Sequence, residues 1–191
     1  MAIPKSAVVI AALIALAGSG CTQPDPNAKP TYACTPSDGG TPQPCYKAEH
    51  DLQAKEDALY AEAEAVYRRF TAEDERIYRM GGIGEPTPEL LALTTGEFLT
   101  DSMIIYRAWK QTKSRLVGGK IRTAWLKRAP ESATPDSQVT MRDCRDASTA
   151  RLVTPGERPV SAGYTSDVLH FTGEPGSLKI SSALGKEVDK C

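Results

Sequence analysis

Apolar residues recur at helical spacing through the first half of the chain. Six of them are separated by 7, 4, 3, 4 and 7 positions: Leu52, Leu59, Ala63, Val66, Phe70 and Ile77. This spacing predicts one face of a long amphipathic helix. The charged residues between them, including Glu73 and Asp74, are interpreted as the solvated opposite face. The pair Gly81-Gly82 predicts the end of this helix.

Two shorter helices are predicted next. Thr87 followed by Pro88 is typical of a helix start, with the threonine as N-cap and the proline at the first helical position. Gly96 then predicts a break, and the apolar residues that follow it indicate a third helix from about Glu97 to Lys113.

The spacing changes to alternation after Gly118-Gly119. Val139, Met141 and Asp143 share one face of a predicted strand. The strand-like segments are 120–127, 137–144, 150–153, 166–171 and 177–183. A run of helices followed by a run of strands predicts an α+β domain, with three N-terminal helices packed on an antiparallel sheet of four to five strands.

The first residues predict export. Lys5 precedes an uninterrupted apolar run from Ala7 to Ala17, which is shorter than the roughly 20 residues that a membrane-spanning helix needs. Leu16-Ala17-Gly18-Ser19-Gly20-Cys21 resembles a bacterial lipobox, in which the cysteine is lipidated and the chain is cut before it. We therefore expect a signal peptide over residues 1–20 and a lipid on Cys21, on the outer face of the cell membrane. Secretion after ordinary signal cleavage is the alternative.

The cysteine count agrees with this expectation. An odd total of five becomes four once Cys21 is lipidated, and four cysteines can form two disulfides in an oxidising compartment. Cys34 and Cys45 enclose a turn-rich loop, and Cys144 and Cys191 remain as the second pair. Four cysteines allow three different pairings, so the two alternative pairings also remain possible. Residues 21–45 are predicted to form a Pro/Thr/Gly-rich tether, and residues 46–191 the domain.

Composition excludes several functions. The formal net charge is −1, so a strongly electrostatic nucleic-acid binder is not expected. Two histidines and the absence of a CxxC spacing give no metal site, and no motif indicates a cofactor or a catalytic set. The composition says nothing about the oligomeric state.

The order of elements resembles the nuclear-transport-factor-two-like fold. The stretches that carry the resemblance are Val139–Asp146, which contains Cys144-Arg145-Asp146, then Leu178–Ser182 and the terminal Gly185–Cys191. They are similar to a pattern in exported proteins and lipoproteins of bacteria with GC-rich genomes. The resemblance implies a curved, cone-like sheet over about residues 48–191. Most members of that family are uncharacterised, so it implies little about function.

A cone-like sheet often encloses a pocket, and six residues are candidates to line it: Tyr67, Asp101, Tyr106, Trp109, Trp125 and Asp143. The sequence favours a non-catalytic lipoprotein that binds a small apolar ligand or another protein. One alternative is a dehydratase or isomerase that uses a buried Asp101 or Asp143 as its acid–base group. Another is an immunity or assembly lipoprotein that acts on a membrane protein.

Overall fold

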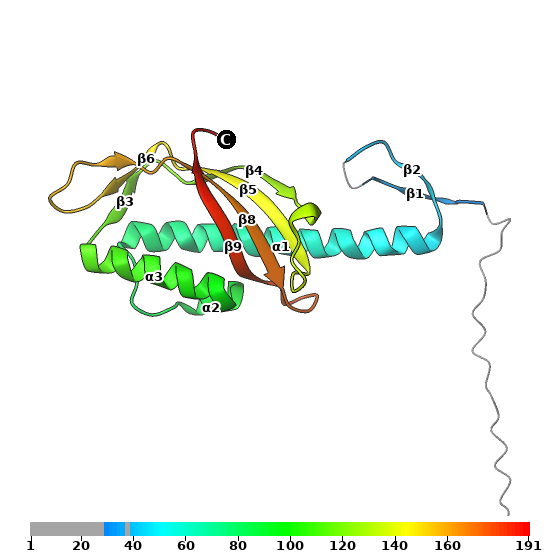
Figure 1. Ribbon diagram of the computed structural model, residues 1–191, viewed down its shortest axis with the longest axis horizontal. Helices are drawn as coiled ribbons and strands as arrows, with labels where there is room; N and C mark the ends of the chain where they lie inside the picture. The colour runs from blue at the N-terminus through cyan, green and yellow to red at the C-terminus, as the bar shows by residue number, and fades with distance from the viewer. Residues whose placement is uncertain (1–28, 37–38) are drawn as a thin grey trace, which may run out of the picture. The chain divides into compact units, whose positions relative to one another are not determined.

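The computed structural model describes residues 29–36 and 39–191, and its contacts divide the chain into two units, Met1–Lys47 and Ala48–Cys191. In the first unit, β1 (Tyr32–Cys34) pairs antiparallel with β2 (Gln43–Cys45) (Figure 1). A disulfide between Cys34 and Cys45 links the two strands. The expected cysteine-closed loop is therefore a small hairpin. The predicted signal peptide and Cys21 lie outside the described residues.

Three helices precede the main sheet, as the sequence predicted. They are α1 (Lys47–Met80), α2 (Pro88–Leu93) and α3 (Gly96–Thr112). Thr87 is the N-cap of α2, because its side chain accepts a hydrogen bond from the backbone N–H of Leu90. Gly82 has a φ of 83° and lies so close to α3 that a Cβ there would be 2.1 Å from the carbonyl oxygen of Tyr106. Glycine is required at that position both for the turn and for the close approach.

The strands form three antiparallel sheets. The main sheet has the order β4-β5-β8-β9. A smaller sheet has the order β3-β6-β7, and the β1–β2 hairpin is the third. The bounds are β3 (Arg115–Gly118), β4 (Arg122–Arg128), β5 (Val139–Asp146), β6 (Ala150–Val153), β7 (Val160–Ser161), β8 (Tyr164–Thr172) and β9 (Lys179–Val188), with a short 3-10 helix η1 (Pro130–Ser132) before β5.

The expected arrangement of three helices on one curved, cone-like sheet of four to five strands is wrong. The structure is α+β, but only α1 is a long helix, and the described residues form nine strands in three sheets. The strands β3 and β7 are too short to show an alternating pattern, and β1 and β2 lie in a segment that was expected to be an extended tether. β6 pairs with β3, so it leaves the main sheet although it directly follows β5.

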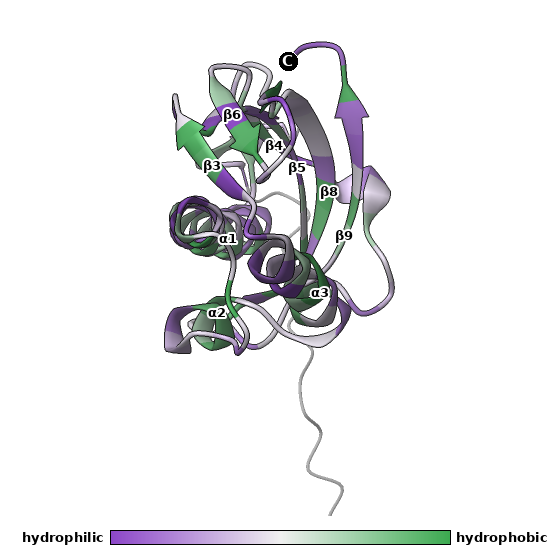
Figure 2. Ribbon diagram, turned by 90° about the vertical axis from the view of Figure 1, so that its left-hand side faces the viewer, coloured by the Kyte–Doolittle hydropathy of each residue, from purple (hydrophilic) through white to green (hydrophobic). Residues whose placement is uncertain are grey.

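Hydrogen bonds from α1 and from the junction of α2 and α3 help to attach the helices to the main sheet. The carboxylate of Glu62 on α1 accepts hydrogen bonds from the backbone N–H groups of Gly176 and Leu178, in the turn between β8 and β9. At the junction of α2 and α3, the N–H of Thr95 donates to the carbonyl oxygen of Ile180 in β9 at 2.9 Å. The three helices consequently lie on one side of the main sheet (Figure 2).

The core lies between the helices and the inner face of the main sheet. Its members come from the three helices and from β5, β8 and β9, and they include Tyr67, Phe70, Ile77, Leu90, Leu93, Tyr106, Met141, Leu169, Phe171 and Ile180. The inward alternation predicted for Val139, Met141 and Asp143 is present, since all three are buried. The predicted apolar face of α1 is buried only in part, because Leu52 remains 66% exposed.

A second disulfide joins Cys144 in β5 to Cys191. Strand β8 lies between β5 and β9 in the sheet, so the residues after β9 cross over β8 to reach Cys144. Both disulfides of the expected pairing are thus present.

Candidate functional site

A cavity of about 170 Å³ lies between α1, α3 and the inner face of the main sheet. One part of its wall is apolar and comes from Phe70, Phe98, Ile105, Leu169 and Ala183. The other part is polar and contains one serine, four aspartates, one arginine and three tyrosines: Ser102, Asp74, Asp101, Asp143, Asp167, Arg145, Tyr67, Tyr78 and Tyr106. The cavity therefore combines an apolar wall with a cluster of titratable groups.

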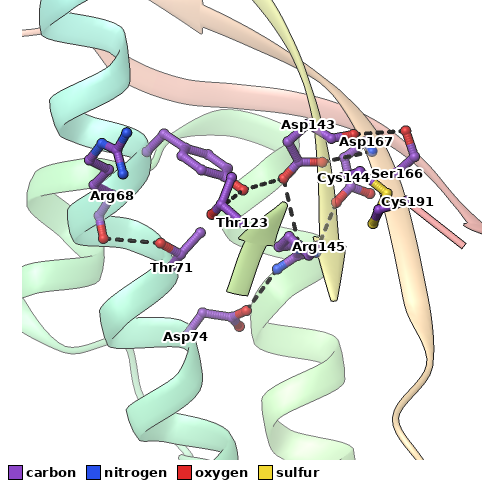
Figure 3. Close-up of polar contacts among 11 residues, drawn as sticks. Arg68, Thr71, Asp74, Thr123, Asp143, Cys144, Arg145, Ser166, Asp167 and Cys191 are labelled. Atoms are coloured by element: carbon purple, nitrogen blue, oxygen red, sulfur yellow. Dashed lines mark hydrogen bonds and ion pairs between the residues drawn. A yellow bond between two sulfur atoms is a disulfide. The ribbon is translucent and has the colours of Figure 1, made fainter. Parts of the chain in front are cut away.

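Arg145 is the centre of this cluster. Its guanidinium bonds to Asp74 of α1 at 3.0 Å and to Asp167 of β8 at 2.8 Å, and its Nε lies 3.7 Å from Asp143. Figure 3 shows Arg145 between Asp74 on the helix side and the two sheet carboxylates. The Nε atom is buried without a hydrogen-bond partner. One cation thus faces three carboxyl groups.

Two buried tyrosines complete the network. Tyr67 donates from its hydroxyl to Asp143 Oδ2 at 2.5 Å, and Tyr106 donates to Asp74 Oδ1 at 2.7 Å. The second oxygen of Asp143 accepts the backbone N–H of Asp167. Burial raises the pKa of both hydroxyls, and the neighbouring carboxylates raise it further. Both tyrosines are therefore neutral donors.

The buried carboxyl groups and Arg145 determine the charge of the site. Burial raises the pKa of Asp74 and of Asp143, although Arg145 opposes the shift in both cases. Burial alone would lower the pKa of Arg145, but the three carboxylates more than compensate, so the guanidinium stays charged. With all three aspartates ionised the cluster has an excess of two negative charges, and binding a proton or a cationic group reduces it.

Glycine makes space for this cluster at one position. Asp167 and Gly185 are directly paired neighbours on β8 and β9 and face the same side of the sheet. A Cβ at Gly185 would be 2.0 Å from Oδ1 of Asp167, so a larger residue would displace this carboxylate.

The structure brings four of the six predicted pocket residues to the cavity. Tyr67, Tyr106 and Asp143 belong to the buried network, whereas Asp101 is exposed where it lines the cavity. The expectation that Asp101 is a buried acid–base group is therefore wrong, because its side chain on α3 is exposed to solvent.

The two tryptophans line other spaces. Trp109 packs on Tyr78, with ring centroids 4.4 Å apart, and lines an adjacent cavity of about 300 Å³ that shares Asp74, Tyr78 and Arg145. Trp125 lies on the outer face of the main sheet, beside Cys144 on the neighbouring strand.

Three residues of the network were not predicted from the sequence, although the spacing of each from its apolar neighbours indicates a buried position. Asp74 was assigned to the solvated face of α1, yet it is four residues after Phe70 and three before Ile77, which is the apolar face. Arg145 is two residues after Asp143, and Asp167 is two before Leu169, so alternation places both on the inner face. A charged residue in phase with an apolar face was the available signal.

No family model, curated protein or solved structure matches this chain. Within the described ranges 29–36 and 39–191, no group of three or more His, Cys, Asp or Glu side chains could hold a metal ion. Over the same residues, no helix is both long and apolar enough to cross a membrane.

Proposed function

We propose that this protein is an exported, lipid-anchored binding protein whose cavity takes a small ligand with an apolar body and a cationic group. The observation that carries the proposal is the cavity itself, in which an aromatic wall faces one arginine and three carboxylates. Its volume of about 170 Å³ suits a ligand of one ring, since a cavity of about 150 Å³ holds benzene.

The chemistry of the network selects the charge of that ligand. Asp74 and Asp143 are buried with too little positive charge nearby, and a ligand ammonium or amidinium group would supply it. An anionic ligand would add to an existing excess of negative charge. The two disulfides support the proposed location, because such bonds persist in oxidising compartments outside the cytoplasm.

Titration of the protein with one-ring probes tests the proposal. We expect benzylammonium to bind and to shift amide resonances of residues around the cavity, and we expect benzoate not to bind. Ser102→Leu fills the cavity from α3 and should abolish the shifts, whereas Thr100→Leu, at an exposed position of the same helix, should leave them unchanged. Equal binding of benzoate, or unchanged binding to Ser102→Leu, would refute the proposal.

An acid–base enzyme is the second candidate, and one observation favours it. Asp143 is fully buried, has a raised pKa and lies on the cavity wall, which are the properties of a group that holds a proton for transfer. If a turnover reaction is found, Asp143→Asn should abolish it. Asp101→Asn is the matched control, because Asp101 lines the same cavity but is exposed. Equal losses in both variants would argue against Asp143 as the acid–base group.

A further inference from the structure

The outer face of the main sheet is a second surface with its own chemistry. The three helices cover the inner face only (Figure 2). On the outer face, η1 covers one end, where the carbonyl oxygen of Ser132 lies 3.1 Å from Nε2 of His170. Within Ala48–Cys191, no other helix or strand covers the remainder of this face, which the residues after β9 cross to bring Cys191 to Cys144.

The charged side chains that line this face are mainly positive. A surface groove of about 580 Å³ runs over it, and its lining contains Arg142, Lys186 and Lys190 but no acidic residue. Lys127 lies beside the groove, with its Nζ 5.1 Å from the centre of the Trp125 ring. The nearest carboxylate to Arg142 is that of the exposed Glu131, at 3.9 Å, which is a long and solvated ion pair. The protein as a whole is close to neutral, so these cations are concentrated here.

Apolar side chains lie between the cations. Leu184 on β9 is 73% exposed, and Trp125 and Val168 line the same groove half-buried. Alternation explains the arrangement: these positions point away from the core because their strand neighbours Leu126, Leu169 and Ala183 point toward it. The surface therefore has an apolar centre, which includes the half-buried ring of Trp125, and a basic margin.

We infer that this outer face docks on an anionic lipid membrane. Lys and Arg are attracted to anionic headgroups, while Trp and Leu side chains enter the boundary between headgroups and acyl chains. A small soluble anion would use the cations but would gain nothing from Leu184. The choice of a membrane over another anionic surface rests on the lipid-anchored location proposed above, but the docking itself requires no lipid on Cys21.

Vesicle binding of the chain that begins at residue 21, as expected after signal cleavage, and carries Cys21→Ser tests the inference independently of lipidation. Vesicles of phosphatidylcholine with about 30 mol% phosphatidylglycerol have a negative surface potential. We expect the protein to bind these vesicles, to be released from them by salt, and not to bind vesicles of pure phosphatidylcholine. Neutralising three cations, as Lys127→Gln, Arg142→Gln and Lys186→Gln, should weaken binding on the order of 100-fold, at about five-fold for each charge.

The matched control removes the same charge elsewhere. Lys55, Arg68 and Lys110 are exposed on α1 and α3, and their simultaneous change to Gln should leave vesicle binding within about two-fold of the unmodified chain. Equal weakening by both triple variants would show a nonspecific charge effect and would overturn the inference. So would equal binding to both kinds of vesicle.

The two tryptophans provide a readout that does not depend on the triple variants. With Trp109→Phe, Trp125 is the sole tryptophan, and its fluorescence should shift to the blue and be quenched by brominated lipids in the anionic vesicles. With Trp125→Phe, Trp109 remains on the helix side and should be unaffected. Quenching of Trp109 but not of Trp125 would place another surface on the membrane and refute the docking face. Benzylammonium binding tests the cavity separately, so the two proposals can fail independently.

Discussion

Arg145 connects carboxylates that come from three different elements, α1, β5 and β8. A single cation in this position compensates part of the charge of Asp74, Asp143 and Asp167. Its removal leaves buried carboxylates without a partner, which costs more than the ion pairs themselves contribute. The residue is therefore both a structural element of the core and part of the cavity wall.

Replacing Arg145 by Gln should lower the free energy of unfolding by about 3–5 kcal/mol, as measured by urea denaturation. The double variant Arg145→Gln with Asp74→Asn removes one uncompensated carboxylate as well. It should lose less stability than the sum of the two single changes, because the residues are coupled. Simple additivity would contradict the network.

Tyr67→Phe tests the short hydrogen bond to Asp143. The variant keeps the ring but removes the O–H donor, so a buried carboxyl oxygen loses its partner. We expect a loss of about 1–3 kcal/mol in the free energy of unfolding and weaker binding of the benzylammonium probe. Tyr164→Phe, at a half-exposed position, is the control and should change stability by less than about 0.5 kcal/mol.

The raised pKa of Asp143 has a consequence for stability against pH. In the folded protein, burial keeps this carboxyl protonated to a higher pH than in the unfolded chain, where the pKa of Asp is about 4. The stability that the raised pKa of Asp143 contributes is fully present below the unfolded-state pKa. It is lost as the pH rises through the folded-state pKa. The free energy of unfolding of the wild type minus that of Asp143→Asn should therefore fall as the pH rises above about 4. A difference that grows with pH would show that the pKa is lowered instead.

At the scale of elements, the start of α2 depends on one side chain. Thr87 accepts the N–H of Leu90 and also donates to Glu73 on α1 at 2.7 Å, so it caps one helix and attaches it to another. Both hydrogen bonds require a hydroxyl at this position.

Thr87→Ala should reduce thermal stability by the equivalent of about 1–2 kcal/mol, and Thr87→Ser should restore most of it. Thr95 is a suitable comparison because it is the N-cap residue of α3 but its side chain makes no capping bond. Thr95→Ala should cost clearly less. A larger loss at Thr95 would show that the side-chain cap is not what stabilises this region.

At the scale of the whole molecule, the two disulfides belong to different units. The Cys144–Cys191 bond spans 47 residues of the larger unit, and Cys34–Cys45 closes a separate hairpin. Linking distant residues stabilises chiefly by restricting the unfolded chain.

Cys144→Ser with Cys191→Ser should therefore lower the free energy of unfolding of the larger unit by about 4 kcal/mol. The matched variant, Cys34→Ser with Cys45→Ser, should leave the unfolding transition of that unit unchanged. Denaturation followed by Trp fluorescence checks both, because the two tryptophans belong to the larger unit. A transition that shifts equally in both variants would mean that the units unfold together.

The local features of this fold follow from the sequence. The spacing of apolar residues predicts α1, the Thr87-Pro88 pair predicts the start of α2, and Gly81-Gly82 predicts the end of α1. Alternation over Val139, Met141 and Asp143 predicts their inward face. Each of these signals depends only on neighbours within a turn or a strand, where the backbone geometry is fixed by the residue type.

The tertiary structure alone determined how the strands divide into three sheets and which charges meet at Arg145. Pairing of β3 with β6, and of β5 with β8 across an intervening segment, depends on contacts between residues far apart in the chain. Asp74, Asp143 and Asp167 are separated by 69 and 24 positions, so no spacing rule brings them to one cation. Asp74 was misread because a charged residue on an amphipathic helix is normally solvated, and only a buried partner from another element reverses that preference.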